Sequence, residues 1–172
     1  MRLELALLAV LTAAAPAVAP VVSYDPDTEF HHYRSYIWAF AHTPSNIDPT
    51  LYRQVRHSID QSLEAHGFVH SPHADFAVGF TVGPRAKMHA SDFGHYAFYY
   101  SASEAASHQD WINRELAQRS DHDDTLSIDI YDTQTKSSVW HGIAPDPVVP
   151  HTRPSIVEHE VDAVVSLFPP RK

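Results

Sequence analysis

The chain has 172 residues, enough for one domain with a sizeable core, and 44% of them are hydrophobic. Its formal net charge of −9 argues against nucleic-acid binding as the main function, because phosphate backbones repel such a surface. The absence of cysteine excludes disulfides, thiol catalysis and thiolate metal sites. Protonation of all 14 histidines would change the net charge from −9 to +5, so mild acid should alter the surface potential greatly.

Residues 1–17 are typical of a secretory signal peptide. Arg2 gives a short basic region, an apolar run follows over residues 5–15, and small residues place cleavage in the window 17–19. The apolar run is too short to span a bilayer comfortably, and a lipid anchor would need a cysteine. We therefore expect a soluble secreted protein with no transmembrane segment and no lipid anchor; a buried N-terminal helix is the alternative interpretation.

Two short strands are predicted first, at residues 21–24 and 35–40. Asp48 and Pro49 are typical of a helix start, with the aspartate as N-cap and the proline at the first helical position. Gly67 favours the end of this helix. One face of the helix carries an apolar stripe at a spacing of four, made by Leu51, Val55, Ile59 and Leu63.

A third strand is predicted at residues 74–82, so strand, helix and strand suggest a right-handed crossover if both strands share a sheet. Residues 84–120 give no clear pattern. The next stretch, residues 125–144, is typical of a β-hairpin. Its first strand alternates Leu126, Ile128 and Ile130 with Ser127, Asp129 and Tyr131.

Three residues of this hairpin are expected to be structural. Asp132 begins the turn and is expected to cap it. Trp140 is expected to cover the core, and Gly142, two residues later on the same face, leaves room for the indole or for a helix. Because side chains alternate along a strand, Val139 is expected to point outward.

The last predicted helix begins at a capping box formed by Ser155 and Glu158 and ends before Pro169. Its buried stripe is Val157, Val161, Val164, Val165 and Phe168. The order of elements predicts a two-layer α+β sandwich, in which two helices cover a mostly antiparallel or mixed sheet of about five to six strands.

Several stretches together resemble the bacterial family catalogued as domain of unknown function 4136. They are "VVSYDPDTEFHHYRSYIWAF", "IDQSLEAHGF" followed by "ADFAVGF", "TLSIDIYDTQTKSSVWHGIA" and "LFPP". The resemblance covers residues 21–170 and implies a single α+β domain in the Gram-negative cell envelope. Many members are lipoproteins, from which this chain departs because it lacks a lipobox cysteine. The family has no established activity, so the resemblance implies a location and a fold but no reaction.

The sequence contains one candidate metal site and one candidate partner-binding surface, and each also has a simpler structural explanation. His66, His70 and His73 lie close together and could bind Zn²⁺ or Cu²⁺, although Gly67 and Pro72 interrupt the helix and a solvated histidine-rich turn is the favoured explanation. An aromatic run could leave a partner-binding surface exposed, or it could belong to the core; its members are Tyr96, Phe98, Tyr99 and Tyr100.

Catalytic signatures are missing from the sequence. Asp129 and Asp132 could be imagined as an acid–base pair, but at a strand-to-turn boundary they should point to different sides. No nucleophile elbow, phosphate-binding loop or dinucleotide fingerprint occurs. The sequence therefore favours a non-enzymatic periplasmic protein, without a required cofactor, that binds an unknown envelope protein. A histidine-based metal-binding or acid-responsive module is the alternative.

Overall fold

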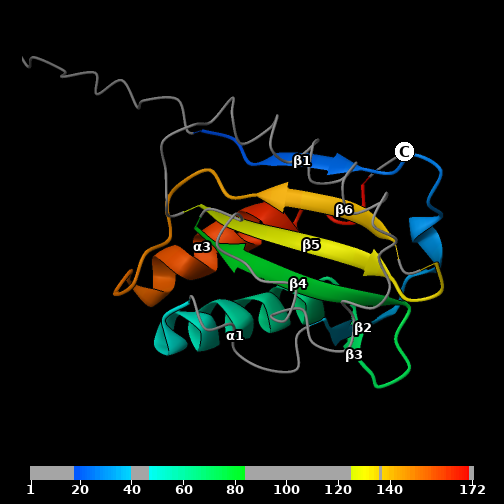
Figure 1. The fold of residues 1–172 in the computed structure, drawn as a ribbon, viewed down its shortest axis with the longest axis horizontal. Helices are drawn as coiled ribbons and strands as arrows, with labels where there is room; N and C mark the ends of the chain where they lie inside the picture. The colour runs from blue at the N-terminus through cyan, green and yellow to red at the C-terminus, as the bar shows by residue number, and fades with distance from the viewer. Residues whose placement is uncertain (1–17, 40–46, 84–124, 136, 171–172) are drawn as a thin grey trace, which may run out of the picture.

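The computed structural model describes residues 18–39, 47–83, 125–135 and 137–170. These residues form one six-stranded sheet, two helices and a short 3₁₀ turn (Figure 1). In chain order the elements are β1 (Val21–Tyr24), η1 (Phe30–His32), β2 (Ser35–Trp38), α1 (Pro49–Ala65), β3 (Val69–His70), β4 (Phe76–Val82), β5 (Leu126–Asp132), β6 (Ser138–Ile143) and α3 (Pro154–Val165).

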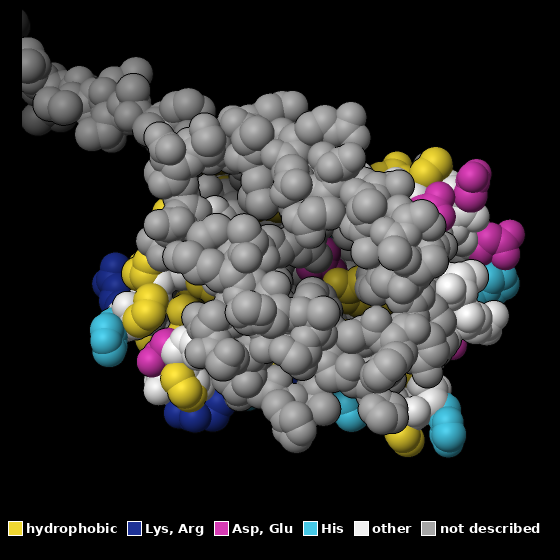
Figure 2. Space-filling model, in the orientation of Figure 1, with side chains coloured by type: hydrophobic (Ala, Val, Ile, Leu, Met, Phe, Trp, Pro, Cys, Tyr) yellow, Lys and Arg dark blue, Asp and Glu magenta, His cyan; other side chains and the backbone are white. Residues whose placement is uncertain are grey.

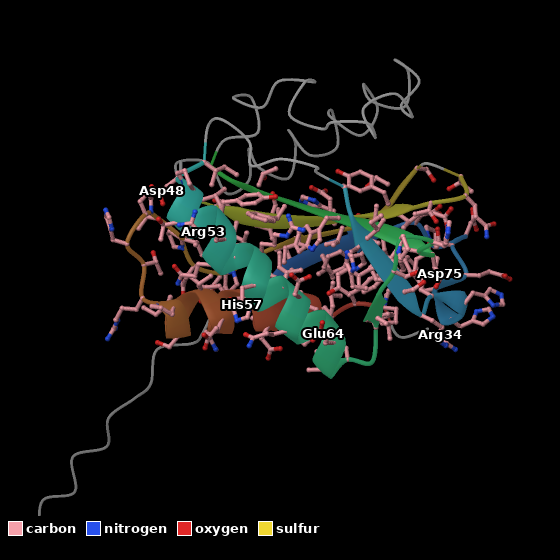
Figure 3. The ribbon with its side chains drawn as sticks, turned by 90° about the horizontal axis from the view of Figure 1, so that it is seen from below. Arg34, Asp48, Arg53, His57, Glu64 and Asp75 are labelled. Carbon is pink, nitrogen blue, oxygen red and sulfur yellow. The ribbon has the colours of Figure 1, made fainter. Side chains whose placement is uncertain are left out.

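The sheet has the order β1-β6-β5-β4-β2-β3 and is mixed. β2 runs parallel to both β3 and β4, whereas the other three neighbouring pairs are antiparallel. α1 lies between β2 and β4 in the sequence, so the predicted strand–helix–strand unit does join parallel neighbours of one sheet. Both helices cover the same face of the sheet, α1 beside α3 (Figures 1 and 3). The predicted two-layer α+β sandwich is thereby confirmed.

The main core lies between the helices and this face of the sheet. Both apolar stripes expected on the helices are buried in it. Polar bonds connect the layers: the hydroxyl of Tyr36 and the indole N–H of Trp38 donate to Asp60 Oδ1 on α1, over 2.7 and 3.0 Å. Between the helices, the Ser62 hydroxyl donates to Asp162 Oδ1 over 2.9 Å. Polar groups that enter the core thus help to hold α1 in place.

The two helices begin differently. Asp48 Oδ1 accepts from the backbone N–H groups of Thr50 and Leu51, each over 2.9 Å, as predicted for α1. The capping box predicted for the last helix is wrong. Pro154 takes the first helical position, so the N-cap is Arg153, whose side chain makes no capping bond, and Ser155 lies inside the helix. The fixed φ of proline suits the first helical position and moves the start upstream of Ser155.

The expectation that Val139 points outward is also wrong, since it is 3% exposed. The pairing of β5 with β6 shifts beside this residue: Ile130 faces Trp140, but Tyr131 faces Ser138. Val139 is therefore the extra residue of a β-bulge, which breaks the alternation of side chains. Val139 and Trp140 consequently both belong to the main core.

β3 was not predicted from the sequence. It has only two residues, both exposed, and it pairs with Ser35 and Tyr36. Nothing in its local pattern indicates a strand, because its partner lies far away in the sequence. None of the helices in the described part of the chain is long and apolar enough to span a bilayer.

Candidate functional site

At one end of the sheet, Asp132 connects the hairpin turn to the N-terminal part of the chain. Its Oδ1 accepts from the backbone N–H groups of Gln134 and Thr135, over 2.8 and 2.7 Å. Its Oδ2 accepts from the hydroxyl of Tyr33, over 2.7 Å. Burial and this hydrogen bond to a carboxylate both raise the pKa of Tyr33, so the phenol stays protonated. Asp132 thus has the geometry of a turn cap.

Asp75 makes a second network at the same end of the sheet, close to Arg34 (Figure 3). Its Oδ2 accepts from the backbone N–H groups of Arg34 and Ser35, over 2.8 and 2.9 Å, and from the Ser35 hydroxyl, over 2.9 Å. The hydroxyl of Thr133 donates to the backbone oxygen of Asp75 over 2.8 Å. These bonds join the starts of β2 and β4 to the hairpin turn.

These two aspartates should make the fold sensitive to acid. Burial raises the pKa of both carboxyls, but the hydrogen bonds they accept outweigh it and hold each pKa below its usual value of about 3.9. A carboxyl whose pKa is lower in the folded protein than in the unfolded chain stabilises the fold fully when the pH is above the unfolded-chain pKa. This stabilisation is lost as the pH falls through the lower, folded-state pKa. The melting temperature should therefore decrease when the pH is lowered below about 4.

The double variant Asp75→Asn/Asp132→Asn tests this prediction. Its melting temperature should be lower than that of the parent at neutral pH and should change less between neutral pH and strong acid. Thermal melts followed by circular dichroism across this range provide the measurement. A variant with the same acid-induced loss as the parent would show that other carboxyls control the transition.

The face of the sheet opposite the helices carries buried polar residues. His141 Nδ1 lies 2.7 Å from Asp129 Oδ1, and the two residues are directly opposite in the β5–β6 register. Two residues from Asp129 along β5 and on the same face, the hydroxyl of Ser127 lies 2.6 Å from that of Thr81. Asp129 is 1% exposed and His141 is 3% exposed. The Asp129–His141 contact thus joins β5 to β6 on this face of the sheet.

Sequence reasoning missed this pair because it considered Asp129 together with Asp132. The two aspartates do face different sides: Asp129 lies in the buried polar row and Asp132 in the turn. His141 could have been suggested as the partner only from the hairpin register, because a short turn places residues of the two strands opposite one another.

The three predicted metal-binding histidines occupy different settings. His66 ends α1, where its Nδ1 lies 2.7 Å from the backbone oxygen of Ser62. His70 lies on β3, where its ring makes a T-shaped contact with Tyr36 at a centroid distance of 5.4 Å, and His73 lies exposed in the following loop. Among the described residues, the group whose ligand atoms converge is a different one: Glu29, His31 and His32. The predicted aromatic surface, residues 96–100, lies outside the described residues.

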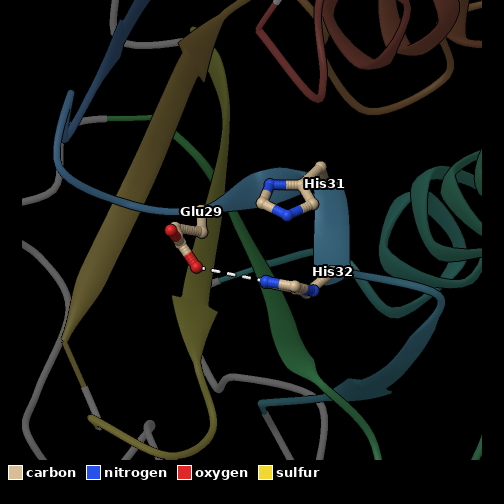
Figure 4. Close-up of side chains that lie close together, drawn as sticks. All are labelled: Glu29, His31 and His32. Atoms are coloured by element: carbon tan, nitrogen blue, oxygen red, sulfur yellow. Dashed lines mark hydrogen bonds and ion pairs between the residues drawn. The ribbon is translucent and has the colours of Figure 1, made fainter.

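The Glu29 group lies in and beside η1 (Figure 4). Its three ligand atoms lie within 4.8 Å of one another, and all three residues are exposed. Sequence reasoning did not select it. The spacing E-x-H-H would have indicated it only if a 3₁₀ turn had been predicted, because such a turn superimposes residues i and i+3.

The described fold defines the class of the protein: a two-layer α+β domain whose mixed sheet is covered on one face by two helices. The chain belongs to the family described as Domain of unknown function (DUF4136), whose model matches residues 20–170. The resemblance drawn from the sequence is thus confirmed.

Solved structures include similar folds. A PDZ domain protein from Parabacteroides distasonis is 14% identical with a TM-score of 0.50; the match covers 90% of this chain, which spans 36% of that protein's length. Two structures of PelC dodecamers from Paraburkholderia phytofirmans are 11% and 10% identical, with TM-scores of 0.48 and 0.47. Each match covers 86% of this chain, and 94% and 95% of the PelC chains. No curated protein matches the chain.

Proposed function

We propose that this protein is a periplasmic accessory domain of the Gram-negative cell envelope that acts by binding another envelope protein rather than by catalysis. Residues 1–17, with the pattern of a signal peptide, support the location. Membership of the family supports it further, because the resemblance to that family implies an envelope location. The lack of a recognisable catalytic motif in the sequence favours binding over catalysis.

The binding proposal rests on one observation, the outer edge of β1. Within the described part of the chain, this strand lies at one end of the sheet order and pairs with β6 alone (Figure 1). The backbone N–H of Asp25 donates to the oxygen of Val139 over 2.9 Å. Since alternate residues of an antiparallel strand bond to the same neighbour, the N–H groups of Val22 and Tyr24 point away from β6.

Exposed apolar side chains accompany this edge. Tyr24 is 41% exposed, and Val18, shortly before β1, is 61% exposed. An extended segment of a partner could bond to the outward backbone groups and cover these side chains, which is recognition by strand addition. The opposite edge is a poorer template, because β3 has only two residues.

A proline at Val22 tests this edge. It removes an outward donor and also changes a side chain that packs partly against the main core, so the melting temperature should fall somewhat but the fold should persist while the partner is lost. We expect the parent protein to be recovered in the periplasmic fraction and to form a crosslink to an envelope protein in intact cells. The yield of crosslinked product should be much lower for the Val22→Pro variant than for the parent.

Two controls accompany this experiment. Val69→Ser changes an exposed apolar residue at the other edge and should retain the crosslink. Ser23→Pro removes a donor that points toward β6 and should lower the melting temperature, which shows that the two β1 positions differ. Recovery of the protein only in the cytosol with its leader intact would contradict the proposed location. Undiminished crosslinking of Val22→Pro would contradict the proposed edge.

A further inference from the structure

The connection between β1 and β2 brings one glutamate and two histidines together on the surface. His32 Nε2 lies 3.1 Å from Glu29 Oε2, and the ring centroids of His31 and His32 are 3.8 Å apart (Figure 4). The side chains of His32 and Glu29 are 66% and 69% exposed. Acidic and histidine side chains gather at the end of the molecule where η1 lies (Figures 1 and 2).

The backbone beneath these side chains is anchored. Phe30, between Glu29 and His31, is 4% exposed, and its ring packs edge-on against Tyr33 and Phe168 at centroid distances of 5.7 and 5.9 Å. The backbone N–H groups of His32 and Tyr33 close the 3₁₀ turn by donating to Glu29 and Phe30. A ligand that binds the exposed groups therefore has to order side chains but not the backbone.

The donor set matches the preferences of zinc. Imidazole nitrogens and carboxylate oxygens bind Zn²⁺ at about 2.0–2.2 Å, and in a tetrahedral site such ligand atoms lie about 3.4 Å apart. The 3.1 Å between His32 Nε2 and Glu29 Oε2 is already close to that edge length. The third ligand atom, on His31, lies within 4.8 Å of both, so a small side-chain rotation brings it into position.

We propose that Glu29, His31 and His32 form a surface site for a divalent transition metal, with Zn²⁺ as the ion that the donors fit best. Solvent water completes the tetrahedron. The ion takes the place of the hydrogen bond between His32 and Glu29, and the carboxylate supplies a negative charge that offsets part of the ion's charge. This site is separate from His66, His70 and His73, and it does not depend on the proposed partner binding.

Calorimetric titration of the untagged full-length protein with Zn²⁺ at neutral pH tests the site. We expect one ion to bind per chain. His31→Gln and His32→Gln, which keep a polar side chain of similar size, should each weaken binding about tenfold or more, and Glu29→Gln should weaken it as well. Since neutral imidazole is the ligand, acidification should also weaken binding. All three side chains are exposed, so the variants should melt like the parent.

The matched control is His70→Gln/His73→Gln, which alters two other exposed histidines and should bind Zn²⁺ as the parent does. A second measurement follows the histidine side-chain resonances of the parent by NMR during the titration, and those of His31 and His32 should move first. The proposal is overturned if the parent binds no Zn²⁺, if His31→Gln and His32→Gln bind it unchanged, or if the control variant loses it instead.

Discussion

Replacing Trp140 with alanine should lower the free energy of unfolding by about 3–5 kcal/mol, a large part of the stability of a small domain. Trp140 is 1% exposed, and its ring packs against Phe168 at a centroid distance of 5.5 Å. Deleting the indole removes buried apolar surface and leaves a cavity in the core that the rigid sheet cannot fill. Urea denaturation followed by circular dichroism measures the loss.

Trp140→Phe is the matched control. The indole N–H of Trp140 is buried and has no acceptor among the described residues, so a phenyl ring removes that unsatisfied donor and keeps much of the apolar contact. The phenylalanine variant should retain most of the stability that the alanine variant loses. If Trp140→Ala instead melts like the parent but no longer captures a partner, Trp140 is a binding residue and not a structural anchor.

Gly142→Ala should be the second most damaging change, with a cost of about 1–3 kcal/mol or more from overpacking. A Cβ at Gly142 would lie against the ring of Trp140 and only 2.5 Å from Val164 Cγ1 on α3. Both neighbours are buried, so neither can move aside cheaply. The glycine thus lets α3 and the indole approach β6, and urea denaturation of the variant measures the cost of blocking them.

A double-mutant cycle with Val164→Ala separates the clash with Val164 from the clash with Trp140. Removing the valine methyls should make Gly142→Ala less costly than it is in the parent. Additive effects of the two changes would show that Val164 does not oppose the new methyl group, and would assign the cost to the indole or to the backbone instead.

The parts of the fold that could be predicted from the sequence are those determined by local chemistry. Asp48, Pro49 and the four-residue spacing of the stripe specify α1 within one segment. The alternation along β5 specifies a strand in the same way. In both cases the neighbours that decide the structure lie within a few residues, so the pattern is visible without the fold.

The errors share a different origin, since each depends on a competing or distant partner. Val139 is buried because the register slips at a bulge, which alternation alone does not indicate. β3 forms because its backbone pairs with the free edge of β2, which lies far away in the sequence. At α3, Pro154 competes with Ser155 for the helix start, and both were visible in the sequence; the mistake was to favour the capping box over the proline.

The candidate sites were less predictable than the fold. His66, His70 and His73 are close in sequence, but a helix end, a strand and a loop separate their side chains. Glu29 and His32 come together because a 3₁₀ turn stacks positions three apart, and that turn is held by Phe30. Proximity in sequence is therefore a weak guide to a metal site until the backbone between the ligands is known.

The pairing of β1 with β6 has a consequence for the order in which the sheet can assemble. Val21 lies opposite Ile143, so the first strand to emerge from a ribosome or a membrane translocon has no partner until nearly the whole chain has followed. β2, α1 and β4 involve shorter separations and can associate earlier. Because closing long loops is slow, we expect β1 to join last, and until then β6 presents an open edge. A chain exported from its N-terminus would therefore complete its sheet only after translocation is almost finished.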